Sequence, residues 1–196
     1  MIRFTKNLNM KKFIVGFSVI AFSAVLFAFT PEKNAPEPIT PIANETAQVK
    51  WYTWDEAIKA AEKSPKKVFV DVYTQWCGWC KKMDQTTFAD PKVAAYLNKN
   101  FYPVKFDAEQ KESINYKNNV LKYRADVGRR GLHELAYALL DGRTSYPSYV
   151  YLDEKQDRIT ISPGYKEAGP FLKELKFISE EHYKTTTYDD YVKKGK

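Results

Sequence analysis

The sequence contains only two cysteines, Cys77 and Cys80, and only two histidines among its 196 residues. One cysteine pair is too few for a framework of structural disulfides, and a structural zinc site normally has four ligands. His133 and His182 have no ligand-like spacing to the cysteines, and both are expected at the surface. The pair is therefore read as a redox centre, with a zinc half-site or an inert structural disulfide as alternatives. No metal is expected.

Acidic residues are absent from the first 30 residues, whose basic residues all precede position 13. An uncharged apolar run follows over residues 13–29, and then a proline-containing polar linker over residues 31–48. This is the layout of a secretory signal. The run is long for a signal core and short for a spanning helix, so residues 1–30 are predicted to be a signal peptide or an N-terminal membrane anchor. Either outcome predicts an exported protein, located in the periplasm, where disulfides form.

The rest of the chain has no concentrated basic stripe. The net charge of +7 falls to +3 when the four basic residues of the N-terminal segment are removed. A mildly basic surface of this kind does not indicate a nucleic-acid partner. Residues 49–184 are of a size that suits one domain with a single core. Residues 185–196 are expected to form a flexible polar tail.

Apolar periodicity and capping signals predict strands and helices in alternation. Thr53 and Glu56 form a capping box, Asp90 and Pro91 begin another helix, and Gly142 follows the end of a third. The expected helices cover residues 54–63, 77–87, 90–98, 132–140 and 170–183, and the expected strands cover residues 68–73, 101–106, 148–152 and 158–161. Strand, helix and strand in parallel give a right-handed βαβ unit and an α/β fold.

The cysteines lie in the segment 68–82, which reads VFVDVYTQWCGWCKK. A C-x-x-C pair between a buried strand and a helix is a dithiol or disulfide centre. The helix N-terminus places partial positive charge at the first sulfur and favours its thiolate, so Cys77 is predicted to be the exposed nucleophile. Cys80 lies one turn further in and is predicted to be the shielded, resolving cysteine.

At these residues the chain resembles the thioredoxin superfamily, and most closely its extracytoplasmic bacterial members. The resemblance covers about residues 49–183. It rests on Asp71 within the strand, on the W-C-x-x-C motif, on Lys105 in the next strand, and on the segment Tyr146-Pro147-Ser148 before a strand. It implies a thioredoxin-like α/β fold, with a central mixed β-sheet flanked by helices and an insertion before the cis-proline strand.

The resemblance also implies a surface for client proteins around the cysteines. Trp76 would shield the site and offer a flat docking face, and Trp79 replaces the proline of thioredoxin's own motif. Neither Gly78 nor Trp79 adds a charge between the cysteines, which favours a reducing role. Pro147 would be cis, with its loop facing the disulfide and Tyr146 offering its backbone to the client. An ordinary trans proline is the alternative.

Asp71 is anomalous because a carboxylate in a buried strand is costly unless it is neutral or paired. By resemblance it is the acid behind the second cysteine, and Lys105 is its neighbouring lysine. The predicted role is a proton relay to Cys80. The alternative is an acid that reaches solvent at the end of the strand.

Residues 110–131 are the main departure from a minimal thioredoxin, because they add a segment rich in lysine, arginine and tyrosine. The segment is interpreted either as a solvated insertion without a role or as a surface for partners near the active site.

The function expected is an exported thiol–disulfide oxidoreductase that works without a cofactor. Its expected partners are protein thiols and disulfides of the cell envelope and a membrane or periplasmic electron donor. The alternative is a thioredoxin-like adaptor or chaperone that binds clients and has only secondary redox activity.

Overall fold

A four-stranded mixed sheet forms the centre of the fold in the computed structural model, which describes residues 47–195. The strands are arranged in the order β2-β1-β7-β8, where β1 and β2 are parallel and the other neighbours are antiparallel. Their bounds are β1 Lys67–Tyr73, β2 Phe101–Asp107, β7 Ser148–Leu152 and β8 Arg158–Pro163. The predicted signal or anchor and nearly all of the predicted linker lie outside the described residues.

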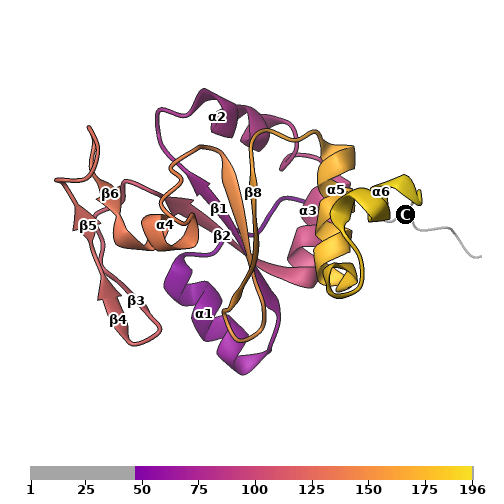
Figure 1. The fold of residues 1–196 in the computed structure, drawn as a ribbon, viewed down its shortest axis with the longest axis horizontal. Helices are drawn as coiled ribbons and strands as arrows, with labels where there is room; N and C mark the ends of the chain where they lie inside the picture. The colour runs from indigo at the N-terminus through magenta and orange to yellow at the C-terminus, as the bar shows by residue number, and fades with distance from the viewer. Residues whose placement is uncertain (1–46, 196) are drawn as a thin grey trace, which may run out of the picture. The chain divides into compact units, whose positions relative to one another are not determined.

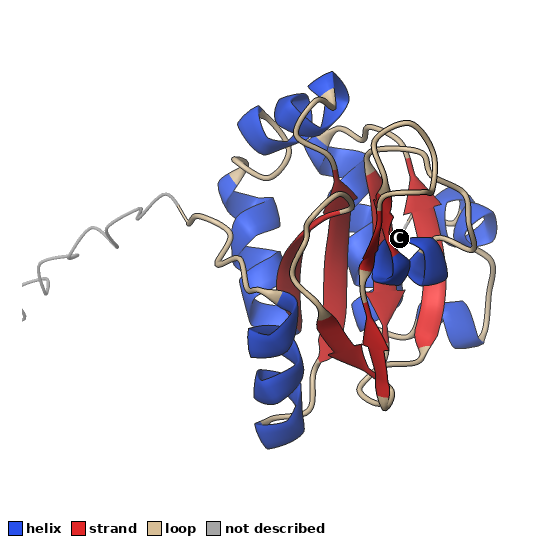
Figure 2. Cartoon of the chain, turned by 90° about the vertical axis from the view of Figure 1, so that its left-hand side faces the viewer, coloured by secondary structure: helices blue, strands red, loops and turns tan. Residues whose placement is uncertain are grey.

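Helices cover both faces of this sheet (Figures 1 and 2). α1 and α4 pack on one face, where the even-numbered valines of β1 point, and α2, α3 and α5 pack on the other, where Phe69 points. The helices are α1 Trp54–Lys63, α2 Gly78–Gln85, α3 Pro91–Asn100, α4 Glu134–Leu139, α5 Ala168–Ser179, the 3₁₀ helix η1 His182–Lys184 and α6 Tyr188–Lys193. Within residues 47–195, none of them has the length and apolar character needed to cross a bilayer.

Local signals account for most of these elements. Thr53 and Glu56 form the predicted capping box of α1, and Asp90 caps α3 with Pro91 in its first turn. Strand β7 is buried along its whole length, as a central strand covered on both faces requires. Pro103 lies in the edge strand β2, where a missing N–H is tolerated, and its carbonyl accepts from Tyr52 N–H at 2.8 Å.

The insertion forms ordered structure beside the sheet. β3 Ile114–Tyr116 and β4 Asn119–Leu121 make a hairpin, and β5 Tyr123–Arg124 pairs with β6 Leu132–His133. Figure 1 shows these strands on the side of the molecule that carries α4.

Two expectations are corrected. His133 is buried rather than at the surface, and one of its ring nitrogens contacts the Glu112 carbonyl at 2.9 Å. The other accepts from Leu135 N–H at 3.0 Å, so His133 is the N-cap of α4, which begins two residues later than predicted. The tail expected to be flexible forms α6 from residue 188, because Thr187 caps the helix and Tyr191 is buried in the aromatic core.

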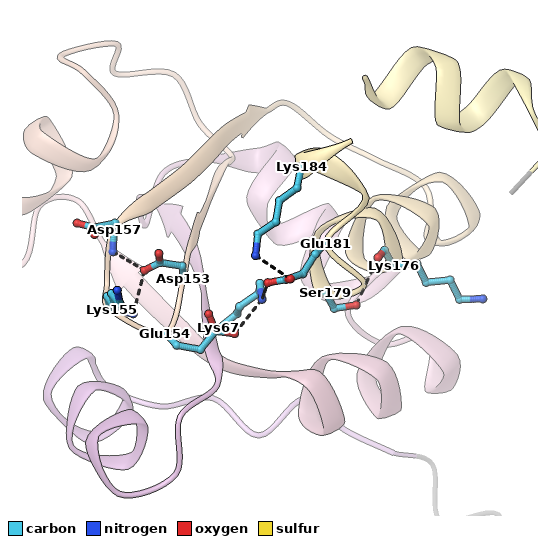
Figure 3. Close-up of polar contacts among 9 residues, drawn as sticks. All are labelled: Lys67, Asp153, Glu154, Lys155, Asp157, Lys176, Ser179, Glu181 and Lys184. Carbon is cyan, nitrogen blue, oxygen red and sulfur yellow. Dashed lines mark hydrogen bonds and ion pairs between the residues drawn. The ribbon is translucent and has the colours of Figure 1, made fainter. Parts of the chain in front are cut away.

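A buried lysine joins two segments at the start of β1, the end of this strand opposite to the cysteines. Lys67 Nζ lies 2.8 Å from Glu154 and 3.0 Å from Glu181, and Lys184 also pairs with Glu181 at 2.7 Å (Figure 3). The lysine side chain is nearly inaccessible, whereas both of its carboxylate partners reach solvent. The network therefore ties the first strand to the β7–β8 turn and to the segment after α5.

Candidate active site

The two cysteines are joined in a disulfide at the N-terminus of α2. Cys77 is the N-cap residue, and the Cys80 N–H in the first turn of the helix donates to its sulfur at 3.1 Å. That contact places the positive end of the helix dipole on the first sulfur, which favours a thiolate there after reduction.

The predicted exposure of Cys77 is wrong for this state of the protein. Cys77 is 5% exposed and Cys80 is 2% exposed. Cys77 is covered because its sulfur is bonded to that of Cys80 and turns toward the first peptide of the helix. The order of exposure agrees with the prediction, but the difference is small.

Asp71 is fully buried in the middle of the sheet and paired with a lysine. Its carboxylate lies 2.6 Å from Lys105 Nζ, and Lys105 also contacts Asp84 on α2. Phe69, Asp71 and Tyr73 alternate with the valines of β1, so Asp71 belongs to the face that α2 covers. The alternative of an acid that reaches solvent is therefore wrong, and Lys105 connects the buried carboxylate to the helix that carries Cys80.

Burial and charge act in opposite directions on this carboxylate. Burial raises the pKa of Asp71, and the positive charge of Lys105 opposes the rise, leaving it at about 6. Burial alone would lower the pKa of Lys105, but the two carboxylates more than compensate, and the pKa of Lys105 is raised. The lysine therefore stays charged at neutral pH, while the proton on Asp71 can be gained or lost near neutrality.

The loop before β7 lies beside the tryptophan of the motif. The peptide bond between Tyr146 and Pro147 is cis, the conformation expected from the sequence. The rings of Tyr146 and Trp76 make an edge contact with their centroids 5.9 Å apart. Pro147 carbonyl accepts from Gly164 N–H, whereas neither backbone group of Tyr146 bonds to another residue among those described. The backbone of Tyr146 is thus available to a ligand next to the disulfide.

Exposed aromatic rings lie on both sides of the cysteine pair. Trp76 is 53% exposed and Trp79 is 56% exposed, with Gly78 between them. The Trp76 indole N–H donates to Glu109 at 2.8 Å, and Trp79 packs against Tyr165 with ring centroids 5.3 Å apart. Both rings are thus held by specific contacts while about half of each residue remains exposed to solvent.

All nine predicted site residues come from segments that the sheet and α2 bring together, and the roles assigned to them remain predictions. Two further residues were missed. Asp84 follows Cys80 by one helical turn, and this spacing places it on the same side of α2. Glu109 lies two residues beyond the end of β2 and holds Trp76. Within residues 47–195, no cluster of three potential metal ligands is present.

Comparisons with known proteins identify the family of this chain and several similar proteins. The family model Thioredox_DsbH, described as a protein of unknown function (DUF255), matches residues 42–168. The chain belongs to this family.

The thiol:disulfide interchange protein DsbD of Ralstonia nicotianae is 26% identical over 123 residues, which are 62% of this chain and 17% of that protein. Spermatogenesis-associated protein 20 of Mus musculus is 28% identical over 95 residues, 43% of this chain and 12% of that protein. This chain thus spans under a fifth of the length of these two relatives.

Solved structures confirm the thioredoxin-like fold. A DsbH oxidoreductase superposes with a TM-score of 0.51 at 16% identity, covering 69% of this chain and 87% of the other. A thioredoxin from Thermus thermophilus gives a TM-score of 0.50 at 21% identity, covering 67% and 87%. The comparisons therefore show a thioredoxin-like fold and membership of the Thioredox_DsbH family, in a chain whose two cysteines form a C-x-x-C disulfide.

Proposed function

We propose that the protein exchanges electrons with disulfides of exported proteins through Cys77 and Cys80. The observation that carries this proposal is the Cys77–Cys80 disulfide at the N-terminus of α2, beside two exposed tryptophans and a loop with available backbone groups. Thiol–disulfide exchange needs a stabilised thiolate, a second thiol within reach, and room for a polypeptide. Each of these needs has a counterpart among the described residues.

In the reducing direction, the Cys77 thiolate attacks one sulfur of a client disulfide. A bond forms between Cys77 and that sulfur, and the other client sulfur leaves as a thiolate. The Cys80 thiolate then attacks the sulfur of Cys77 and releases the first client sulfur. Two electrons have passed to the client, whose two thiolates take up protons, and the protein is left as the Cys77–Cys80 disulfide.

Asp71 is proposed to accept the proton of the Cys80 thiol before the second attack. A base is most effective when its pKa is close to the working pH, and burial, opposed by the charge of Lys105, brings the pKa of Asp71 to about 6. Lys105 holds the carboxylate in place through the 2.6 Å contact, and its positive charge favours the ionised form of Asp71. The two residues thus act on the second step rather than the first.

The client is proposed to lie across Trp76, Gly78, Trp79, Tyr146 and Pro147. The free backbone groups of Tyr146 would pair with an extended client segment, as strand addition to a sheet does. Gly78 has nothing within 4 Å of a Cβ placed on it, so the backbone there leaves room for a client chain. The exposed parts of the two tryptophans add contact area on each side.

Location and direction are part of the proposal. The predicted signal or anchor, together with the disulfide chemistry, supports a periplasmic protein that acts on cell-envelope clients, either released or tethered to the membrane. The uncharged Gly78-Trp79 pair supports a reductase, which needs a membrane or periplasmic electron donor to regenerate its dithiol. Residues 110–131 also support the alternative of a client-binding adaptor, because residues 127–131, in the loop between β5 and β6, line a pocket together with Trp76.

Turnover separates these two functions. The dithiol form of the protein is mixed with a disulfide-linked peptide, and the formation of peptide thiols is followed with and without an added reductant that recycles the protein. An oxidoreductase gives repeated turnovers that are lost in Cys77→Ser. Binding of the peptide without turnover would favour the adaptor.

A further inference from the structure

A pocket of about 470 Å³ lies next to Trp76, the residue that precedes Cys77. Trp76 and Tyr146 form one wall, and the end of the insertion forms the other. Its lining includes Trp76, Glu109, Arg129, Arg130, Gly131 and Tyr146. Two of these residues immediately precede Cys77 and Pro147 in the chain, so the pocket is continuous with the proposed client surface.

The wall contributed by the insertion is held in place by its own contacts. Tyr123 pairs with His133 across β5 and β6, and its hydroxyl donates to the Arg130 carbonyl at 2.5 Å. Gly131 has a φ of +74°, and a Cβ at this position would lie 2.0 Å from the Tyr123 hydroxyl oxygen. The close approach therefore requires glycine. This contact positions Arg129 and Arg130 at the pocket.

The charge of the pocket is positive. Arg129 and Arg130 are exposed, and neither forms an ion pair with any of residues 47–195. The guanidinium carbon of Arg130 lies 5.8 Å from the centre of the Trp76 ring. Glu109 is the one acid in the lining, and its carboxylate already accepts the Trp76 indole N–H. Two arginines with no ion-pair partner among the described residues thus line a pocket that is large enough for a side chain.

From this geometry we propose that the pocket binds an acidic side chain of the client polypeptide, close to the client cysteine. The inference rests on the proposed function, because the client would be held through Cys77 and Tyr146. Side chains of an extended segment point alternately to opposite sides, so a residue near the cysteine points toward the pocket. Guanidinium groups bind carboxylates in two-pronged hydrogen bonds, and a glutamate or aspartate would match Arg129 and Arg130.

The test uses three disulfide-linked peptides that differ only near the cysteine, where they carry glutamate, glutamine or lysine. For the intact dithiol protein, kcat/KM should be about tenfold higher for the glutamate peptide than for the lysine peptide. The preference should fall as salt is raised. It should disappear in the Arg129→Gln/Arg130→Gln variant. Lys92→Gln/Lys99→Gln removes the same charge from exposed positions on α3 and should keep the preference.

A binding experiment separates this inference from the proposed function. In Cys77→Ser/Cys80→Ser, fluorescence anisotropy measures binding of labelled peptides with alanine at the cysteine position. Tighter binding of the glutamate peptide, lost in the added Arg129→Gln/Arg130→Gln change, supports the pocket even if no peptide disulfide is ever reduced. Equal binding of the glutamate and lysine peptides, or a preference that survives loss of both arginines, overturns it. Turnover of all three peptides at one rate would overturn the pocket while supporting the proposed function.

Discussion

Asp71 and Lys105 lie directly opposite each other on the parallel strands β1 and β2, and their charged groups are 2.6 Å apart. The carboxylate is buried, whereas the lysine is only partly covered and also reaches Asp84 at the surface of α2. The carboxylate oxygen Oδ1 has no hydrogen-bond partner among the described residues. One ion pair therefore only partly offsets the cost of burying this acid.

Asp71→Asn should change how the stability of the oxidised protein depends on pH. The pKa of Asp71 is raised from 3.8 to about 6, so between these values the folded state holds a proton that the unfolded state has lost. Stability contributed by the protonated acid is present below pH 4 and is lost as pH rises through 6, by up to about 3 kcal/mol. The difference in unfolding free energy between Asp71→Asn and the wild type should therefore shift in favour of the variant between pH 4 and pH 7.

Urea unfolding at several pH values between 4 and 7 measures this difference. Asp84→Asn is the matched control, because it removes the other carboxylate that contacts Lys105 from a side chain that is 43% exposed. Parallel stability curves for Asp71→Asn and the wild type would show that the buried acid does not titrate in this range.

Asp71→Asn should also slow the second step of disulfide exchange. If the carboxylate takes the proton of Cys80, its loss should lower the rate of resolution of the mixed disulfide by about a hundredfold. The first attack by Cys77 should change much less. Stopped-flow mixing with a disulfide peptide resolves the two steps, and an unchanged resolution rate with an unchanged pH profile would reduce Asp71 to a structural residue.

Cys80→Ser should accumulate mixed disulfides with client proteins, because the resolving thiol is absent. Cys77→Ser should accumulate none, since it lacks the N-cap sulfur whose thiolate the helix N-terminus stabilises for the first attack. Non-reducing electrophoresis followed by mass spectrometry detects the adducts. Adducts of equal yield in both variants would contradict the assignment of nucleophile and resolving cysteine.

Lys67→Ala should destabilise the fold without changing the chemistry. The substitution removes a nearly inaccessible ammonium group that bonds Glu154 and Glu181, and should cost about 1–2 kcal/mol of unfolding free energy. Lys66→Ala is a neighbouring control, because the Lys66 ammonium makes only a long hydrogen bond of 3.4 Å to the Asn98 carbonyl and a contact of 4.8 Å with the centre of the Tyr102 ring among the described residues. Slower peptide reduction by folded Lys67→Ala would be inconsistent with a purely structural network.

The sequence predicts most of this fold because local signals and the family resemblance agree. Thr53 and Asp90 cap helices where expected, and the buried strand that carries Asp71 leads directly into the cysteine motif. Contacts between distant segments could not be predicted in the same way. The burial of His133 depends on a carbonyl of the insertion, and that of Tyr191 on packing against Phe177. Neither residue lies in a periodic apolar pattern of its own.

The site shows the same division. Cys77, Cys80 and Asp71 already indicated redox chemistry, because two closely spaced thiols that follow a strand with an acid in its apolar run are typical of a disulfide centre. Asp84 looked like an ordinary polar residue of an amphipathic helix until the fold placed it against Lys105. The position of Arg130 near Trp76 likewise depends on the Tyr123 and Gly131 contact, which joins residues of the insertion.

The reduction potential of the Cys77–Cys80 pair tests the central claim most directly. The protein is equilibrated in buffers of graded dithiol and disulfide content, and the fraction oxidised is measured by thiol alkylation and mass spectrometry. A reductase should give a value near that of thioredoxin, about −270 mV. A value near about −120 mV, as in a strongly oxidising disulfide protein, would contradict the reducing direction. A pair that stays oxidised below about −300 mV would be a structural disulfide and would contradict the redox function itself.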